Sequence, residues 1–151
     1  MSQSLCKIYL HVVFHIKMNS PEIRDCDLKR VHAYLGGMVN QTGCQAIIVG
    51  GIGNHVHILC MLSRTENIAH LVEEIKRKSS YWIKTLDDYY DTFAWQGGYA
   101  AFSVSQSVVE RTTKYIENQR EHHKQKTFDE EYIGFLKLYH IDYDERYVFT
   151  A

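Results

Sequence analysis

Long apolar segments and paired cysteines are both missing from this chain. No stretch of its 151 residues is apolar for the length that a membrane span needs, and the N-terminus lacks the apolar core of a signal peptide. The cysteines are scattered singly, which is not the pattern of a disulfide framework or of a Cys-x-x-Cys zinc site. The sequence therefore predicts a cytoplasmic protein without a membrane partner. Its thiols are expected to be reduced and mostly buried, at Cys6, Cys26, Cys44 and Cys60.

A strong net charge is missing too. The whole chain carries a formal charge of −1, but residues 127–151 hold six acidic side chains against only Lys137 and Arg146. The preceding residues carry a small positive excess, which is a weak electrostatic footprint for binding phosphates. The length suits one domain. We expect a folded unit over residues 1–126, and an acidic extension over residues 127–151 that packs on the same unit or on a partner chain.

What the sequence does contain is a pair of histidines inside an apolar strand. Residues 53–61 read Gly-Asn-His-Val-His-Ile-Leu-Cys-Met. Because alternate side chains of a strand point to the same side, His55 and His57 project together, while Val56 and Ile58 point to the opposite face. Two imidazoles side by side on a rigid element make half of a divalent-metal site. The alternative is a pair of histidines that are merely packed.

The order of the predicted elements indicates an α+β fold. Periodicity and turn signals predict a strand at 5–17, a helix at 22–41, a strand at 44–49 and a glycine-rich hairpin turn at 50–54 that leads into the histidine strand. A capping box at Ser63 and Glu66 opens a helix that runs to about residue 86. A strand at 99–104, a helix from Ser105 or Ser107 to about residue 124 and a short helix at 128–139 complete the chain. The first six elements match the ferredoxin-like split βαβ pattern, a four-stranded antiparallel sheet to which a tyrosine-bearing helix is added toward the C-terminus. That pattern puts the first strand beside the third.

A second chemical feature lies on the third predicted helix. Tyr115 and Gln119 are four residues apart, so they share one helix face. Aimed at the two histidines, Gln119 would complete a metal shell through its carbonyl oxygen, and Tyr115 would be a nucleophile. A mixed nitrogen and oxygen shell favours Mn²⁺ or Mg²⁺ over structural zinc. Such a cation would polarise a scissile phosphate.

Three motifs together resemble a known family. They are Gly-Asn-His-Val-His-Ile-Leu at residues 53–59, Trp-Gln-Gly-Gly-Tyr at residues 95–99 and Tyr-Ile-x-x-Gln at residues 115–119. From about residue 5 to residue 125, the chain is similar to the single-tyrosine HUH-type transposases of small bacterial insertion sequences and to their domesticated relatives associated with repetitive palindromes. The resemblance identifies His55 and His57 as the family's histidine pair, Tyr115 as its nucleophile and Gln119 as its helix-borne metal ligand.

The resemblance implies a metal-dependent DNA transposase, with residues 1–126 as its catalytic domain. Such enzymes bind hairpins of single-stranded DNA at the ends of their element and cut beside them. The tyrosine forms a 5′-phosphotyrosine link and leaves a free 3′-OH, which later attacks a second such link. The resemblance also implies a homodimer, in which the tyrosine helix often acts in trans at the histidine site of the partner.

Two other functions stay open on the sequence alone. A domesticated or inactive descendant would bind DNA hairpins without cutting them. A ferredoxin-like metal-binding protein would have no nucleic-acid substrate, as the nearly neutral charge favours. DNA contacts are expected of a basic run on the second predicted helix, although such a run is commonly a solvated face, and of two histidines on the first strand. Two histidines near the end of the third helix are alternative metal ligands or DNA contacts. The basic run consists of Lys76, Arg77 and Lys78. The histidines on the first strand are His11 and His15, and those near the end of the third helix are His122 and His123.

Overall fold

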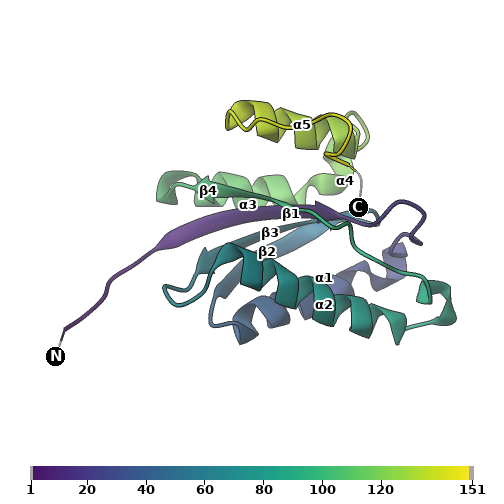
Figure 1. Ribbon diagram of the computed structural model, residues 1–151, viewed down its shortest axis with the longest axis horizontal. Helices are drawn as coiled ribbons and strands as arrows, with labels where there is room; N and C mark the ends of the chain where they lie inside the picture. Colours follow the sequence, from purple (N-terminus) through teal and green to yellow (C-terminus); the bar gives the residue numbers. More distant parts are fainter. Residues whose placement is uncertain (1, 150–151) are drawn as a thin grey trace.

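The computed structural model describes residues 2–149 and has an α+β architecture (Figure 1). Within these residues, four strands form one antiparallel sheet in the order β2-β3-β1-β4. They are β1 (Ile8–His15), β2 (Gln45–Ile52), β3 (His55–Leu62) and β4 (Ala100–Val104). The ferredoxin-like prediction is confirmed, and with it the pairing of the first strand with the third.

Five α-helices lie within the described residues and cover both faces of the sheet. α1 (Asp25–Gln41) and α2 (Ile68–Lys84) cover one face, whereas α3 (Val109–Glu117), α4 (Gln119–His122) and α5 (Phe128–Leu138) lie on the other (Figure 1). Two 3₁₀ turns, Asp88–Tyr90 and Gln106–Val108, precede β4 and α3. In the part of the chain that is described, no helix is both long and apolar enough to cross a membrane.

The sheet face under α1 and α2 is apolar. Leu10, Val12 and Phe14 alternate along β1 and point to this side, as the two-residue period of a strand requires. They belong to one buried cluster with Val31 and Leu35, which are four residues apart on the inner face of α1. This cluster is the larger of the two apolar clusters, and it holds α1 and α2 against the sheet.

The opposite face carries a smaller apolar cluster that holds α5 in place. Phe128, Tyr132 and Leu136 recur every four residues along α5 and pack against Val13 of β1 and Phe102 of β4. α3 and α4 lie over β2 instead. The two central strands of the sheet, β3 and β1, carry the histidines.

Gly50 lets α3 approach β2 closely. A Cβ atom at Gly50 would lie 2.7 Å from both the main-chain oxygen and Cγ2 of Ile116 in α3, closer than such atoms pack. Residues 50–52 continue β2, so the predicted hairpin turn over residues 50–54 is wrong for these three residues. The turn is confined to Gly53 and Asn54. Glycine at position 50 serves the close approach of a helix to a strand.

The predicted start of the second helix is wrong. The capping box expected at Ser63 and Glu66 does not form, because the Ser63 hydroxyl accepts the N–H of Thr65 within a local turn. Asn67 caps α2 instead, through a side-chain oxygen that accepts the N–H of His70 at 2.8 Å. The helix consequently begins at residue 68.

The third predicted helix is interrupted twice. Ser105 precedes a 3₁₀ turn, and its side chain makes no capping bond. Asn118, with φ −97° and ψ 23°, then separates α3 from α4. The short helix expected at 128–139 is confirmed as α5, and a reciprocal capping box forms at its start, between Thr127 and Glu130.

The remaining differences concern element ends and cysteine exposure. β1 is shorter than the expected strand at 5–17, and α1 begins at residue 25 rather than 22. Cys44 and Cys60 are buried as expected. Cys6 and Cys26 are exposed, because Cys6 precedes β1 and Cys26 lies on the outer face of α1.

Candidate active site

Three histidines from the two central strands meet on the face of the sheet that carries α3 and α5. β1 and β3 pair in a register that sets Val13 opposite His57 and His15 opposite His55. His11 and His57 are therefore diagonal neighbours, and Nε2 of His11 lies 2.7 Å from Nδ1 of His57. The side chains of His11, His55 and His57 are buried. The pairing of the first strand with the third thus brings His11 onto the same surface as His55 and His57.

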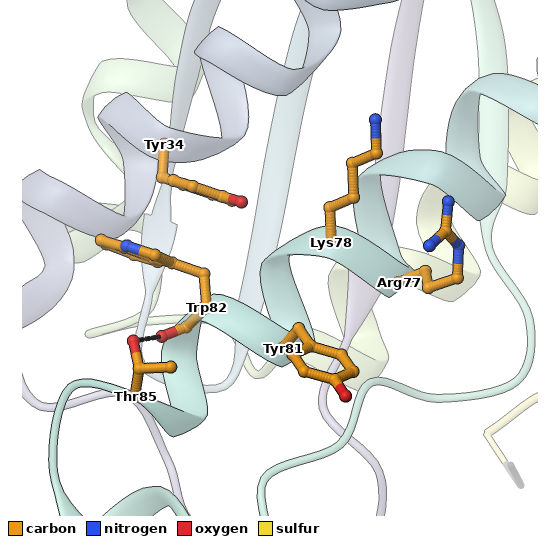
Figure 2. Close-up of a pocket in the computed structure, with 6 residues that line it drawn as sticks. All are labelled: Tyr34, Arg77, Lys78, Tyr81, Trp82 and Thr85. Atoms are coloured by element: carbon orange, nitrogen blue, oxygen red, sulfur yellow. Dashed lines mark hydrogen bonds between the residues drawn. The ribbon is translucent and has the colours of Figure 1, made fainter.

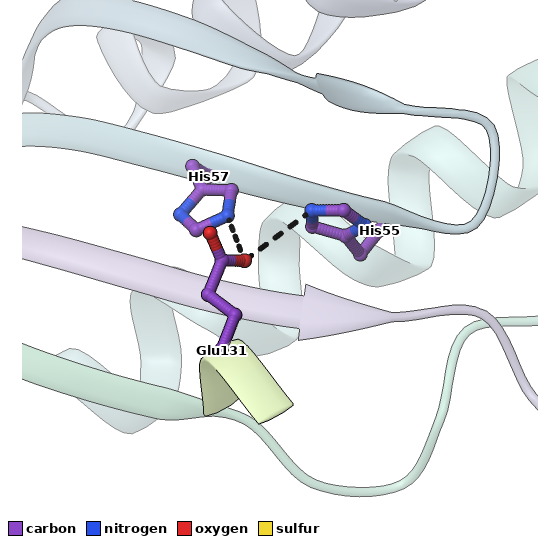
Figure 3. Close-up of side chains that lie close together, drawn as sticks. All are labelled: His55, His57 and Glu131. Atoms are coloured by element: carbon purple, nitrogen blue, oxygen red, sulfur yellow. Dashed lines mark hydrogen bonds and ion pairs between the residues drawn. The ribbon is translucent and has the colours of Figure 1, made fainter. Parts of the chain in front are cut away.

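α5 adds a carboxylate to these histidines. Oε1 of Glu131 lies 3.0 Å from Nε2 of His57 and 3.6 Å from Nε2 of His55 (Figure 3). One ligand atom from each of the three side chains lies within 4.8 Å of the others, a spacing that allows them to share a metal ion. Glu131 is only 4% exposed. A carboxylate buried to this degree depends on partners of this kind.

Glu131 was missed at the sequence level, where it counted only as one acid of the C-terminal extension. A signal was nevertheless present. Positions 128, 131, 132, 135 and 136 have the spacing of one helix face, and the other four positions are aromatic or aliphatic. A single carboxylate in an otherwise apolar stripe is a buried charge that requires a partner. The pattern of α5 therefore marks Glu131 as a buried carboxylate, but it does not specify which partners the carboxylate meets.

Tyr115 and Gln119 reach the same cluster from α3 and α4. The hydroxyl of Tyr115 donates to Oε2 of Glu131. The side-chain amide of Gln119 donates to the same oxygen at 3.2 Å, and Oε1 of Gln119 lies 2.9 Å from Nε2 of His55. The break at Asn118 does not separate the two side chains, since Nε2 of Gln119 lies 3.4 Å from the main-chain oxygen of Tyr115. The tyrosine, the glutamine and the strand histidines thus lie together.

The two histidines that follow have different surroundings. The His123 side chain is 6% exposed, and its Nε2 lies 3.1 Å from Oε1 of Gln119 and 3.3 Å from Oε1 of Glu131. His122 is exposed and packs against the ring of Tyr115, with the ring centroids 4.5 Å apart. Of this pair, His123 is the one that adds a nitrogen to the cluster, whereas His122 covers one side of the phenol.

The surroundings favour neutral side chains at His55 and His11 and a charged carboxylate at Glu131. Burial, together with the neighbouring His57, lowers the pKa values of His55 and His11 to about 3. Burial by itself would raise the pKa of Glu131, but hydrogen bonds from His57 and Tyr115 bring it below its ordinary value. Burial and the contact with Glu131 raise the pKa of Tyr115. The phenol therefore keeps its proton, with a charged acceptor beside it.

The donor set fits a divalent cation. A neutral imidazole has one N–H, yet both nitrogens of His55 face oxygens: Nδ1 lies 2.7 Å from Oδ1 of Asn54, and Nε2 faces Oε1 of Gln119. The amide group of Gln119 is held in this orientation by its bond to Glu131. In this orientation of the Asn54 amide, one contact of His55 opposes two lone pairs; the conflict is removed by a cation bound by Nε2, or by an Asn54 amide that donates to Nδ1. Neutral imidazoles with carboxylate and amide oxygens are ligands suited to Mn²⁺ or Mg²⁺.

The basic residues expected to contact DNA lie on the other side of the sheet. Lys76, Arg77 and Lys78 belong to α2, and the structure brings none of them to the histidine cluster. Lys76 donates to the main-chain oxygens of Gln96 and Gly98 at 2.9 and 2.5 Å, so it ties α2 to the loop before β4.

Arg77 and Lys78 share the carboxylate of Glu74, at 2.9 and 3.2 Å. They border a separate cavity of about 280 Å³, beside a pair of stacked rings, Tyr34 and Trp82 (Figure 2). Their charge is thus partly neutralised by the protein itself.

His15 also stays apart from the cluster. Its Nδ1 lies 2.5 Å from the main-chain oxygen of Ile16, and its ring packs against Phe128 at the start of α5. Burial lowers its pKa. Of the two histidines expected as DNA contacts on the first strand, His11 alone touches the cluster.

Comparison with known proteins connects this arrangement to one family. The family model described as "Transposase IS200 like" matches residues 4–119, a span that contains the strand histidines, Tyr115 and Gln119 but ends before Glu131. Among solved structures, a candidate transposase from Deinococcus radiodurans is 19% identical with a TM-score of 0.60, over 79% of this chain and 98% of that one. No curated protein gives a significant match.

A second solved structure has the same fold. It is a REP-associated tyrosine transposase bound to a REP hairpin, 11% identical with a TM-score of 0.60, over 82% of this chain and 74% of that one. At these identities the two structures show a shared fold. The family model adds the sequence pattern over most of the chain. The chain belongs to the family of IS200-like transposases.

Proposed function

We propose that this protein is a metal-dependent DNA transposase that cleaves and rejoins single-stranded DNA, with Tyr115 as its nucleophile. One observation carries the proposal: a phenol and two histidines meet on a single carboxylate. Oε2 of Glu131 accepts the hydroxyl of Tyr115, while Oε1 lies against His57 and His55. Membership of the IS200-like family supports DNA as the substrate.

The proposed reaction is a transesterification. The phenolic oxygen of Tyr115 attacks the phosphorus of a phosphodiester, the P–O3′ bond breaks, and the 5′ end remains attached as phosphotyrosine. Glu131 takes the phenol proton, since it already accepts that hydrogen bond, and the departing O3′ takes a proton from water. A free 3′-OH then attacks the phosphotyrosine, which releases Tyr115 and restores a phosphodiester. No nucleotide is consumed, because the bond energy is kept in the covalent link.

His55, His57 and Glu131 would hold a divalent cation, Mg²⁺ or Mn²⁺, with the amide oxygen of Gln119 as a further donor. When bound, the cation would supply Lewis-acid polarisation of the phosphate and neutralise charge that develops on its oxygens. His11 orients the ring of His57 through the contact at Nδ1, as outer-shell partners of ligating histidines do. On this proposal the extension from residue 127 belongs to the catalytic unit, because it carries Glu131.

Hairpins of single-stranded DNA are the proposed partners, supported by the neighbour of the same fold that is bound to a REP hairpin. We also propose that Tyr115 acts in cis, whether or not the protein is a homodimer, because it contacts Glu131 of its own chain. Mixing Tyr115→Phe protein with His57→Ala protein tests this point. Action in cis leaves the mixture without a covalent product, whereas action in trans restores one.

The proposed function is tested with single-stranded hairpin oligonucleotides from the DNA that flanks the coding sequence, incubated with the protein and Mn²⁺ or Mg²⁺. We expect a protein–DNA adduct that survives denaturation, that requires the metal and that is lost in Tyr115→Phe. The absence of an adduct from the unmodified protein, or an equal amount from Tyr115→Phe, would refute the catalytic assignment. Hairpin binding without an adduct would indicate a domesticated or inactive DNA-binding protein. Metal binding without DNA binding would indicate a metal-binding protein.

A further inference from the structure

A cavity of about 290 Å³ borders Tyr115, and neither His55 nor His57 lines it. It lies between α3 and α5, and its lining includes His11 from β1 and Val104 from β4. Its volume is close to the lower end of the range for small-molecule pockets, about 300 Å³. A group that occupies it would contact the ring of Tyr115 directly.

The cation at this cavity is Arg111. It is one helical turn before Tyr115, so both side chains lie on the same face of α3, with Cβ atoms about 5–6 Å apart. Arg111 is exposed and, among residues 2–149, takes part in no salt bridge. Lys114, in the same helix, pairs with Glu110 at 3.7 Å and does not line the cavity. A guanidinium without a protein partner, beside a phosphate-attacking tyrosine, is suited to bind a phosphate.

The cavity wall opposite α3 is aromatic. Phe135 and Tyr139 both line the cavity, and both rings stack on Phe102 of β4, with centroids 5.2 and 4.7 Å apart. Tyr139 is fixed further by its hydroxyl, which donates to the main-chain oxygen of Ser103 at 3.1 Å. These rings are therefore held in place before any ligand arrives. Fixed aromatic rings next to a cation are the combination that binds unpaired bases of single-stranded nucleic acid.

We propose that this cavity is a nucleotide subsite: it receives one unpaired nucleotide of the DNA strand next to the phosphate that Tyr115 attacks, with the base against Phe135 and Tyr139 and the phosphate on Arg111. The inference rests on the proposed function, since it assigns the substrate of Tyr115. It adds a binding residue, Arg111, and a pocket lined neither by His55, His57 and Glu131 nor by the basic run of α2. Arg111 positions the strand; the metal site and Tyr115 act on it.

Binding is measured separately from cleavage, in the Tyr115→Phe background, by fluorescence anisotropy. The probe is a fluorescein-labelled hairpin oligonucleotide from the flanking DNA that ends in a thymidine tail. We expect Arg111→Ala to weaken binding about tenfold, as for loss of a charged hydrogen bond, and to reduce the salt dependence by about one phosphate contact. Lys114→Ala, which removes the same charge from the same helix, should change the affinity less than about twofold. Arg111→Lys should restore part of the loss.

A second arm tests the aromatic wall. Replacing the thymidine tail by abasic sugar phosphates keeps the charges and removes the bases, so it should weaken binding to the Tyr115→Phe protein. In a Val108→Trp variant, whose indole fills the cavity, thymidine and abasic tails should bind equally well; circular dichroism checks that it is folded. The inference is overturned if Arg111→Ala and Lys114→Ala weaken binding to the same extent, or if the abasic tail binds the Tyr115→Phe protein as well as thymidine does.

These results are distinguishable from a failure of the proposed function. Loss of the adduct in the unmodified protein would refute catalysis by Tyr115 and leave the binding measurements to decide the subsite. Conversely, an adduct that forms normally while the Arg111 and abasic arms show no effect would keep the catalytic proposal and refute the nucleotide subsite.

Discussion

Two tyrosines, each bonded to a buried carboxylate, lie on opposite sides of the sheet. On the side of α1 and α2, the hydroxyl of Tyr90 donates to Asp27 at 2.5 Å. On the side of α3 and α5, the hydroxyl of Tyr115 donates to Glu131. Asp27 is 5% exposed and Glu131 is 4% exposed, so burial of the carboxylate does not distinguish the two pairs, although Tyr90 is buried and Tyr115 is half-buried. What differs is the set of groups around each of them.

The Tyr90–Asp27 pair is complete within the protein. The Tyr90 hydroxyl accepts the main-chain N–H of Arg24 at 2.9 Å, and the second oxygen of Asp27 accepts the guanidinium of Arg30 at 2.5 Å. Each proton has an acceptor and the carboxylate has a cation. This pair therefore holds Tyr90 and α1 together and leaves no group for a substrate.

The Tyr115–Glu131 pair is incomplete. Its carboxylate faces the imidazoles of His55 and His57 in place of an arginine, and a cavity lies beside the phenol. A candidate active site is thus distinguished from a structural pair by imidazoles in place of an arginine and by space next to the nucleophile. A buried carboxylate and a hydrogen bond from a tyrosine are common to both.

The largest expected contrast is in covalent chemistry. Tyr115→Phe should lower the rate of adduct formation at least about 10⁴-fold, as removal of a nucleophile does, whereas Tyr90→Phe should leave the rate within a few-fold. The measurement is the initial rate of the denaturation-resistant adduct at a temperature where both variants are folded. A Tyr90→Phe variant that lost the adduct while remaining folded would remove the distinction between the two pairs.

The next contrast is in metal binding. Glu131→Gln keeps the shape of the side chain and removes a charged ligand, so the affinity for Mn²⁺ should fall about 10- to 100-fold or more. Asp27→Asn, the matched change at the other pair, should leave the affinity unchanged. Titration calorimetry with Mn²⁺ in the absence of DNA measures both. Equal affinities in Glu131→Gln and the unmodified protein would show that Glu131 is not a ligand.

The contrast reverses for stability. Tyr90→Phe should lower the free energy of unfolding by about 1–3 kcal/mol, because the N–H of Arg24 loses its acceptor and Asp27 loses a donor in a buried place. Tyr115→Phe should cost less, since Glu131 keeps the donors from His57 and Gln119. Urea denaturation of the metal-free proteins gives both values. A larger loss for Tyr115→Phe would contradict this order.

The sheet and the strand histidines follow from the sequence because they depend on local, periodic information. Alternation along β1 and β3 assigns His11, His55 and His57 to one face, and the order of the elements puts these strands side by side. The Tyr115–Gln119 spacing likewise keeps both side chains on one side, and this survives the break at Asn118. For these residues, periodicity and topology were sufficient.

The parts that were missed depend on contacts between distant segments. Glycine at position 50 looks like a turn residue until α3 is known to lie against it. The hydroxyl of Ser63 has two uses, a helix cap or a local turn, and the sequence does not rank them. Glu131 becomes a site residue only when α5 packs over β1 and β4, which no local pattern specifies. The position of Arg111 relative to a cavity is of the same kind.

The smallest expected effect concerns acid stability, and it compares the two carboxylates directly. The hydrogen bond from Tyr90, followed by the contact with Arg30, lowers the pKa of Asp27 below its ordinary value of 3.8. A lowered native pKa means that the unfolded chain binds the proton more tightly. The stability that Asp27 contributes is therefore complete above pH 3.8 and is lost as the pH falls through the native pKa.

The difference in unfolding free energy between the unmodified protein and Asp27→Asn should stay constant above that pH and shrink below it. Glu131→Gln should show the same sense from its ordinary value of 4.5. A difference that grew on acidification would mean that the carboxylate concerned is protonated in the native state.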